Sequence, residues 1–305
     1  MTNTYGKVSG TFEEITEIHA NVSGTWKEVD EAYANVSGTW QQVFAAFTAT
    51  SYVTLSSGSS TFVVPDGANA IHIQYAVGGG GGAAGGESAG AGGGSGAYVS
   101  DKIFSVTEGE TISYSVGSGG AAGNQTANFK QPRIASAGTS TTLSGSTAGS
   151  IFTLGAGGGS SGTGGSVQGP LRTNTAGTAG TATISGTAVT SGTFKDSDGT
   201  TKNVTSNTSG PVGTFNQSGN GAVGNISGSN NCGGDNCQIG GSNGAASYAG
   251  TISGGAGSPT GSSTAGGSGT RGSGGGGGGA QVSGGSSDGG VGGNGEIKYR
   301  FLRVN

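Results

Sequence analysis

The chain has 305 residues, of which 72 are glycine, 9% are charged and 30% are hydrophobic. Glycine makes up about 7% of average proteins, so this composition excludes an ordinary soluble enzyme. Five prolines and irregularly clustered glycines exclude collagen. The best apolar run, at 43–47, is too short for a membrane-spanning helix, and we expect no signal peptide before it.

The net charge of −4 is concentrated at the N-terminus, because residues 1–48 carry two lysines against six carboxylates. The rest of the chain balances at ten basic and ten acidic side chains. Without a basic excess, the electrostatic attraction that drives nucleic-acid binding is missing, and so is a basic helix for a lipid surface. We therefore expect neither a nucleic-acid partner nor membrane insertion.

Residues 1–48 contain three copies of a 14-residue repeat. The sequence Val-Ser-Gly-Thr followed by Phe or Trp begins at Val8, Val22 and Val36, and Ser-Gly between β-prone stretches predicts a hairpin turn. Each unit is too short to bury a face alone. The repeats therefore predict a β-meander that stacks on itself or on a partner, with a helix over 12–20 as the weaker alternative.

A β-sheet domain is predicted over 49–118, completed by a strand at 295–304. The segment 70–77 alternates, with Ile71 and Ile73 on one face and His72 on the face assigned to solvent. Similar strand patterns flank turn signals before and after it, and the C-terminal strand is best buried by returning to the same sheet. We predict a mainly β protein with an antiparallel, sandwich-like sheet.

Residues 119–294 are rich in Gly, Ser, Thr, Asn and Ala. Such a composition usually gives disorder, because it buries too little apolar surface to offset the entropy of ordering. An extended threefold helix is the alternative, because segments without side chains can pack side by side and exchange backbone hydrogen bonds. Glycine tracts at 78–82, 157–159 and 274–279 would then be packed polyglycine II helices. The segments between such tracts would be exposed, variable loops.

The titratable residues give little support to catalysis. His19 occupies a repeat position otherwise held by Tyr or Phe, and neither it nor His72 has a recognisable nucleophile and acid in its sequence context. No Gly-Lys-Ser/Thr phosphate loop occurs, and Asp196 with Asp198 is poor support for a depolymerase. We predict no catalytic residues, no enzyme activity and no cofactor.

Cys232 and Cys237 are the only cysteines, separated by Gly-Gly-Asp-Asn. A zinc site usually needs four ligands, and neither a second cysteine pair nor a histidine is near, so we expect no metal. The flexible spacer allows a disulfide, with free thiols as the alternative.

The order of these features resembles the glycine-rich domain of bacteriophage tail proteins. The resemblance rests on the strand ending in Val64-Pro65-Asp66-Gly67, the strand 71–77 leading into 78–82, the Glu108-Gly109-Glu110 turn and the closing glycines before the last strand. The Val-Ser-Gly-Thr-Trp repeats look like those at the N-termini of phage fibre and tail-tip proteins. More distantly, the glycine tracts are similar to the polyglycine II tail-fibre adhesins of T-even-like phages.

This resemblance implies a tail fibre or tail-tip adhesin that attaches the virion to a host surface glycan or outer-membrane protein. The protein would be assembled in the host cytoplasm and exposed on the virion, as a homotrimer or as a monomer capping a trimeric fibre. Virion docking is assigned to the repeats, through Phe12, Trp26, Trp40 and Phe44. Receptor contacts are assigned to 168–175, 193–217 and 229–248, through Arg172, Phe194, Lys195, Phe215 and Tyr248.

Two other classes stay open at this point. A purely structural virion protein, such as a fibre shaft or capsid decoration, would use the same glycine-rich surface without binding a receptor. An ice-binding or matrix protein would need regular threonine arrays, and Thr173 and Thr175 are too irregularly placed to favour it.

Overall fold

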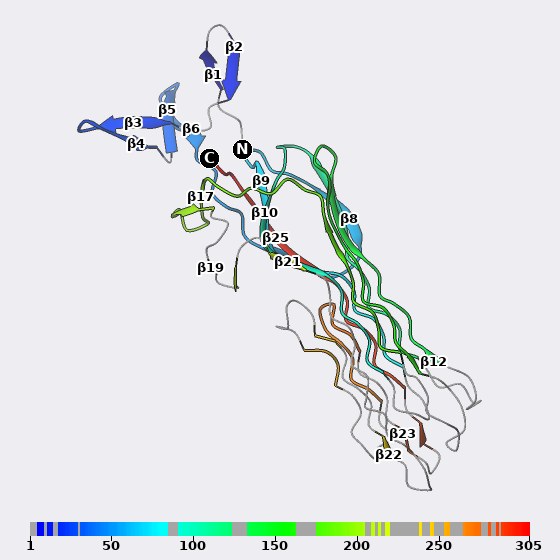
Figure 1. Cartoon of the computed structure of the whole chain (residues 1–305). Coiled ribbons are helices and arrows are strands. Elements are labelled where there is room, and N and C mark those ends of the chain that lie inside the picture. Colours follow the sequence, from blue (N-terminus) through cyan, green and yellow to red (C-terminus); the bar gives the residue numbers. More distant parts are fainter. Residues whose placement is uncertain are drawn as a thin grey trace.

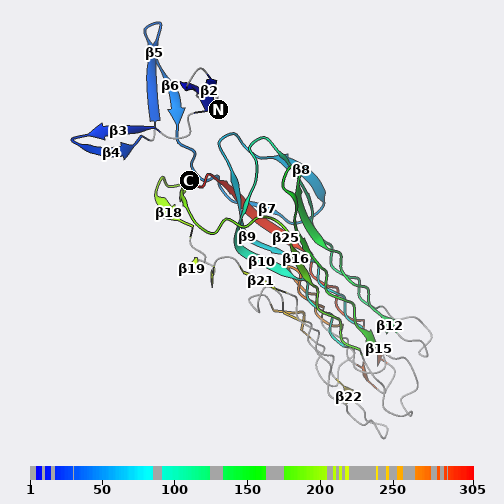
Figure 2. The same cartoon turned by 45° about the horizontal axis from the view of Figure 1, so that its top comes forward.

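The computed structural model describes residues 5–8, 11–14, 18–29, 31–84, 91–123, 133–162, 175–204, 209–210, 213–214, 217–219, 238–239, 245–246, 253–256, 265–275, 280–281, 285–286 and 288–305. Within these ranges the protein is all-β, with 25 strands and no helix. The prediction of a mainly β protein is therefore confirmed. A sandwich of two sheets lies at the centre, with N-terminal hairpins at one end and a bundle of extended segments leading away from the other (Figures 1 and 2).

The N-terminal repeats fold as three separate hairpins. Each hairpin is its own two-stranded antiparallel sheet, and no ladder joins one hairpin to the next in the described ranges. The structure thus has a hairpin for each 14-residue unit, and the helix alternative is wrong where it meets the described strands. The strands are β1 (Tyr5–Val8), β2 (Thr11–Glu14), β3 (His19–Val22), β4 (Thr25–Glu28), β5 (Glu31–Val36) and β6 (Thr39–Ala45).

The first five-stranded sheet, here called sheet I, has the antiparallel order β21-β10-β9-β25-β7. Its C-terminal strand lies between two strands that precede it by more than 200 residues, so the predicted return of the last strand to the sheet is confirmed. The strands are β7 (Val53–Leu55), β9 (Ala70–Val77), β10 (Tyr98–Ser105), β21 (Gln217–Gly219) and β25 (Glu296–Leu302).

The second, here called sheet II, has the antiparallel order β16-β14-β13-β11-β8. Three of its strands come from the segment that the sequence assigns to the glycine-rich region, because short Ile/Leu/Phe/Thr stretches there alternate well enough to form strands. The strands are β8 (Ser59–Val63), β11 (Thr111–Ser115), β13 (Thr141–Gly145), β14 (Gly149–Leu154) and β16 (Ala182–Ile184).

The hydrophobic core lies between the two sheets. Ile71 and Ile73 of β9 are fully buried, as predicted, together with Phe104 of β10. Sheet II contributes Leu143 and Phe152, and the rings of Phe104 and Phe152 are 6.4 Å apart. Alternation along each strand thus supplies one apolar face per sheet, and the two faces make one core.

The remaining short strands form three antiparallel two-stranded sheets, β12-β15, β17-β18 and β19-β20, and one three-stranded sheet, β22-β23-β24. Their strands are β12 (Arg133–Ile134), β15 (Ser161–Gly162), β17 (Thr193–Lys195), β18 (Thr201–Asn203), β19 (Ser209–Gly210), β20 (Gly213–Thr214), β22 (Gln238–Ile239), β23 (Ala280–Gln281) and β24 (Gly285–Ser286).

Beyond the sandwich, extended glycine-rich segments continue from the strands as a bundle (Figure 2). In the segment 78–84, successive backbone N–H groups donate to three neighbouring segments in rotation, and each neighbour recurs at every third residue. The N···O distances are 2.8 to 3.3 Å, for the donor–acceptor pairs Gly78–Ala97, Gly79–Thr139, Gly80–Gly293, Gly81–Gly94, Gly82–Ser136, Ala83–Gly290 and Ala84–Ala91.

The carbonyl oxygens of the same segment follow the same period. Gly79 and Gly82 accept from the segment 157–160, and Gly80 and Ala83 accept from 120–123. A sheet would direct alternate residues to two neighbours, whereas a threefold helix directs every third residue to one neighbour. The bundle has the period that polyglycine II packing requires, and the helix type itself stays a prediction.

Close approach explains why these positions are glycine. A Cβ at Gly81 would lie 1.9 Å from the carbonyl oxygen of Gly158, and one at Gly82 would lie 2.0 Å from that of Ala121. No real Cβ tolerates such contacts with backbone atoms. The glycines therefore allow neighbouring backbones to come within hydrogen-bonding distance in several directions at once.

Candidate functional site

The repeat sequence determines the turn of the second and third hairpins. Ser23 and Gly24 have φ values of 55° and 85°, and Ser37 and Gly38 have 51° and 86°. Positive φ at both central residues is the two-residue hairpin turn that matches strand twist. In both hairpins the side-chain oxygen of the asparagine before the valine accepts a hydrogen bond from the glycine N–H at 2.9 Å. The sequence Asn-Val-Ser-Gly therefore specifies the same turn in both.

The predicted docking tryptophans lie at equivalent positions on these tips. Trp26 faces Asn21 across β3–β4, and Trp40 faces Asn35 across β5–β6. Each indole is 69% exposed. Phe12 and Phe44 lie on β2 and β6, but their side chains fall outside the part that the structure describes. An isolated two-stranded hairpin is marginally stable in water. A partner that packs on the exposed indoles would therefore stabilise these hairpins.

The predicted receptor residues are not brought together in the described ranges. Arg172, Phe215 and Tyr248 lie outside them, as do Cys232 and Cys237. Phe194 and Lys195 lie on β17, which pairs with β18. The Phe194 side chain is 6% exposed and packs in a second apolar cluster. Its ring therefore faces the protein, and receptor binding by this residue stays a prediction that the burial disfavours.

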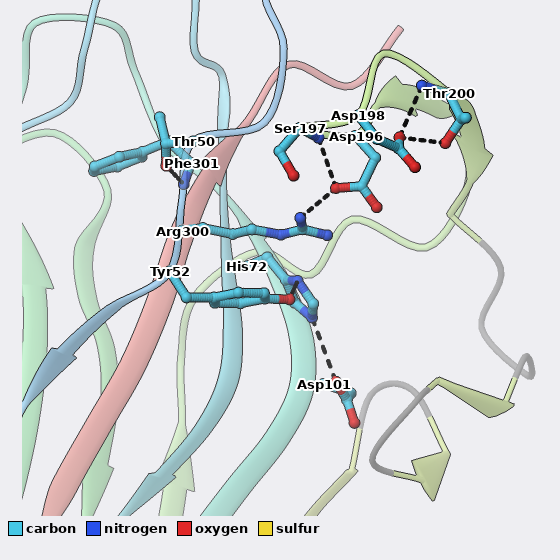
Figure 3. A network of polar contacts seen from close by, with 10 residues as sticks. All are labelled: Thr50, Tyr52, His72, Asp101, Asp196, Ser197, Asp198, Thr200, Arg300 and Phe301. Atoms are coloured by element: carbon cyan, nitrogen blue, oxygen red, sulfur yellow. Dashed lines mark hydrogen bonds and ion pairs between the residues drawn. The ribbon is translucent and has the colours of Figure 1, made fainter.

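Phe194 borders a polar network. The network joins Arg300 to the turn between β17 and β18 (Figure 3). The Arg300 guanidinium, on β25, forms an ion pair with Asp196 and lies 5.6 Å from the Phe194 ring centroid and 4.6 Å from that of Tyr52. Arg300 is 8% exposed. Partial burial opposes ionisation of Asp196, but hydrogen bonds from the Ser197 N–H and from Arg300 outweigh it and hold the pKa of this carboxyl below its ordinary value.

His72 belongs to the same network, and its predicted solvent exposure is wrong. The side chain is 4% exposed, because the chain around Tyr52 covers the face of β9 that alternation assigns to solvent. The Tyr52 hydroxyl lies 3.0 Å from His72 Nδ1, and His72 Nε2 lies 3.5 Å from Oδ1 of buried Asp101. Burial is the main cause that lowers the pKa of His72, and burial raises the pKa of Tyr52 to about 12.

This network contains groups that general acid–base chemistry uses, and its contacts join segments that lie far apart in the sequence; it is here called the polar clamp. His72, Asp101 and Arg300 are each less than 10% exposed. A neutral imidazole can accept a hydrogen bond from tyrosine at Nδ1. These contacts tie the chain before β7, strands β9, β10 and β25, and the β17–β18 hairpin together. Alternation along β9 could not reveal the polar clamp, since its partners lie far apart in the sequence.

The described ranges contain no group of three or more His, Cys, Asp or Glu side chains suited to a metal ion. They also contain no helix with the length and hydrophobicity needed to cross a membrane.

The far end of the bundle is the other candidate surface. The described segments end there with Ala84 bonded to Ala91, and with β12 paired to β15. The described ranges 31–84 and 91–123 each have an end at this face. Figure 1 places β12 at the opposite end of the molecule from the N-terminal hairpins, and β17 near the hairpins.

A family model described as a glycine-rich domain matches residues 54–302. The match covers most of the chain, including both sheets and the bundle, and begins after the three hairpins. A search of curated proteins found no match. The chain therefore belongs to the glycine-rich domain family.

Proposed function

We propose that this member of the glycine-rich domain family is a bacteriophage tail fibre or tail-tip adhesin that attaches a virion to a host surface receptor. The proposal rests on the resemblance of the repeats and glycine tracts to phage tail proteins. It places the N-terminal hairpins on the virion, where other tail proteins contact them, and exposes the rest of the chain outside. A host glycan or outer-membrane protein is the receptor, and the resemblance implies a homotrimer.

The observation that best supports an adhesin is the separation of two ends by a bundle held together through backbone hydrogen bonds. The hairpins with exposed Trp26 and Trp40 lie at one end, and the segment ends near β12 lie at the other (Figure 1). Because backbone groups hold the bundle together, the connecting segments can vary in sequence without loss of its bonds. Such an arrangement suits attachment at one end and recognition at the other.

This geometry favours one of the predicted receptor segments over another. Thr175 begins the described segment that bonds to 92–95 in the bundle, and Arg172 lies three residues before it in the sequence. The β17–β18 hairpin lies on the hairpin side, with Phe194 buried. We therefore propose that 168–175 contributes more to receptor binding than 193–204, which is the part of the predicted segment 193–217 that forms this hairpin.

Binding of the full chain to cells of candidate hosts tests the proposal. The chain should bind cells that adsorb the phage and should compete with adsorption. Replacement of 168–174 by Gly-Ser should weaken binding at least tenfold, about 1.4 kcal/mol. The matched control replaces 197–199, at the exposed tip between β17 and β18, by Gly-Ser and should bind normally.

Failure of the folded chain to bind any host that adsorbs the phage would contradict the adhesin. That result would support the structural alternative, a fibre shaft or capsid decoration. Binding that depends on 197–199 but not on 168–174 would keep the adhesin and overturn the assignment of its receptor side.

A further inference from the structure

Strand β8 is an open edge of the central sandwich. It is the last strand in the order of sheet II, with β11 as its neighbour on one side. Ser59, Thr61 and Val63 point to the outer face and are all exposed, Val63 to 59%. This edge lies on the sandwich itself, away from both the hairpins and the far end of the bundle (Figure 1).

The hydrogen bonds at the two ends of the β8–β11 ladder show which backbone groups face outward. Val116 N–H donates to the Gly58 carbonyl, and Val64 N–H donates to the Glu110 carbonyl, both at 2.9 Å. In an antiparallel pair, residues bonded to the neighbour alternate with residues bonded in the other direction. Residues 58, 60, 62 and 64 therefore face β11, and the N–H and C=O groups of Ser59, Thr61 and Val63 face the open edge.

Within the described ranges, this edge carries none of the features that normally keep sheets apart. Natural proteins guard edge strands with charges, prolines, bulges or a covering segment. Residues 48–64 contain no charged residue and no proline, and the β8–β11 register has no shift. No hydrogen bond within the described part of the chain uses the outward groups of Ser59, Thr61 or Val63.

The strand is also held in place from within. The Phe62 ring stacks on Tyr299 with centroids 4.6 Å apart and planes 11° from parallel, and it contacts Tyr114 and Phe301 at 6.0 and 5.8 Å. These contacts anchor the inward face of β8 to both sheets. A partner strand would therefore meet a preorganised edge, which lowers the ordering cost of association.

We propose that β8 pairs antiparallel with β8 of a second copy of this chain. Centred on Thr61, the pairing sets Thr61 opposite its counterpart and Ser59 opposite Val63, and each facing pair exchanges two backbone bonds. The strand has no charge to repel its copy, and the contact covers exposed Val63. The pairing is twofold, so it predicts two copies where the resemblance to phage fibres implies three.

Sedimentation equilibrium of the full chain tests this pairing, with two variants of Thr61. T61P removes an outward N–H while leaving the bonds to β11, because proline is accepted on the open side of an edge strand. T61K places a charge on the edge. Each should raise the dimer dissociation constant roughly 10- to 100-fold. The matched control S113K adds the same charge to the outer face of β11, one strand further in, and should stay dimeric.

A wild-type mass of one copy or of three copies would overturn the pairing, as would a dimer that both Thr61 variants leave intact. If T61P fails to fold, T61K decides alone. Because mass is measured without host cells, failure of this pairing leaves the receptor-binding proposal to its own test.

Discussion

A Cβ placed on Gly80 would lie 1.9 Å from the carbonyl oxygen of Ser273, although the two residues are separated by most of the chain. We predict that Gly80→Ala destabilises the protein by about 3 kcal/mol or more, because overpacking against backbone cannot be relieved by a side-chain rotation. Thermal unfolding followed by circular dichroism measures the loss as a fall in Tm.

The matched control for this substitution is Gly123→Ala in the same bundle. There the nearest atoms to a Cβ are 3.4 Å away, an ordinary contact. This variant should unfold within a few degrees of the parent. Equal destabilisation of both variants would mean that loss of glycine itself, and not close approach, controls the bundle.

The pH dependence of stability should reflect buried His72. Burial and nearby Arg300 lower its pKa below the ordinary value of 6.5, while Asp101 and Asp196 oppose them. The unfolded chain then takes up a proton more readily than the folded one. The contribution of His72 is therefore complete above about pH 6.5 and is lost as the pH falls from there towards the folded pKa.

Urea unfolding at pH 8, 6.5 and 5.5 measures this effect, with His72→Gln as the comparison. Glutamine keeps a polar side chain but does not titrate, so the variant should show a flatter profile between pH 6.5 and 5.5. Parallel profiles would remove His72 as the source of the pH dependence.

The ion pair between Asp196 and Arg300 should matter more than its neighbour on the same hairpin. Asp196→Asn leaves a guanidinium that is 8% exposed without its carboxylate, and we expect a loss of about 1.5–3 kcal/mol. Asp198 is exposed, and its carboxylate accepts hydrogen bonds from the N–H and the hydroxyl of Thr200 (Figure 3). Asp198→Asn should change the urea midpoint much less, and equal losses would contradict a special role for the Asp196–Arg300 pair.

Local patterns predicted the sheets well because alternation acts over a few residues. The strand 70–77 and the return of Ile297, Tyr299 and Phe301 to its sheet follow from period-two hydrophobicity. Alternation also led to the wrong assignment of His72. The outer face of a sheet is exposed only if no other segment covers it. Tyr52 and the β17–β18 hairpin cover this face of sheet I from distant parts of the chain.

The neighbours within the bundle, in contrast, could not be predicted from the sequence. Glycine content indicated that backbones could approach closely, but not which segments would be neighbours. In the structure, Gly80 donates to Gly293 and accepts from Gly120, and no side chain distinguishes these partners from others. Neighbours are instead set by the strands that enter and leave the bundle. The candidate site is likewise only half predictable, since Trp26 and Trp40 are exposed while Phe194 is buried.

Loss of the exposed indoles should separate docking from folding. Trp26 and Trp40 are each 69% exposed on hairpins outside the core, so Trp26→Ala, Trp40→Ala and the double variant should change unfolding free energy by less than about 0.5 kcal/mol. Under the proposed function they should weaken attachment to the virion, since buried tryptophans at interfaces contribute about 2 kcal/mol or more. The measurement is the number of copies of each variant per purified particle, after complementation of a phage that lacks the wild-type chain.

Ile134→Ala is the control, because it removes a 71% exposed apolar side chain at the opposite end of the molecule. Normal incorporation of the double variant would contradict docking through the indoles, whereas reduced incorporation of Ile134→Ala as well would point to a general effect of surface truncation.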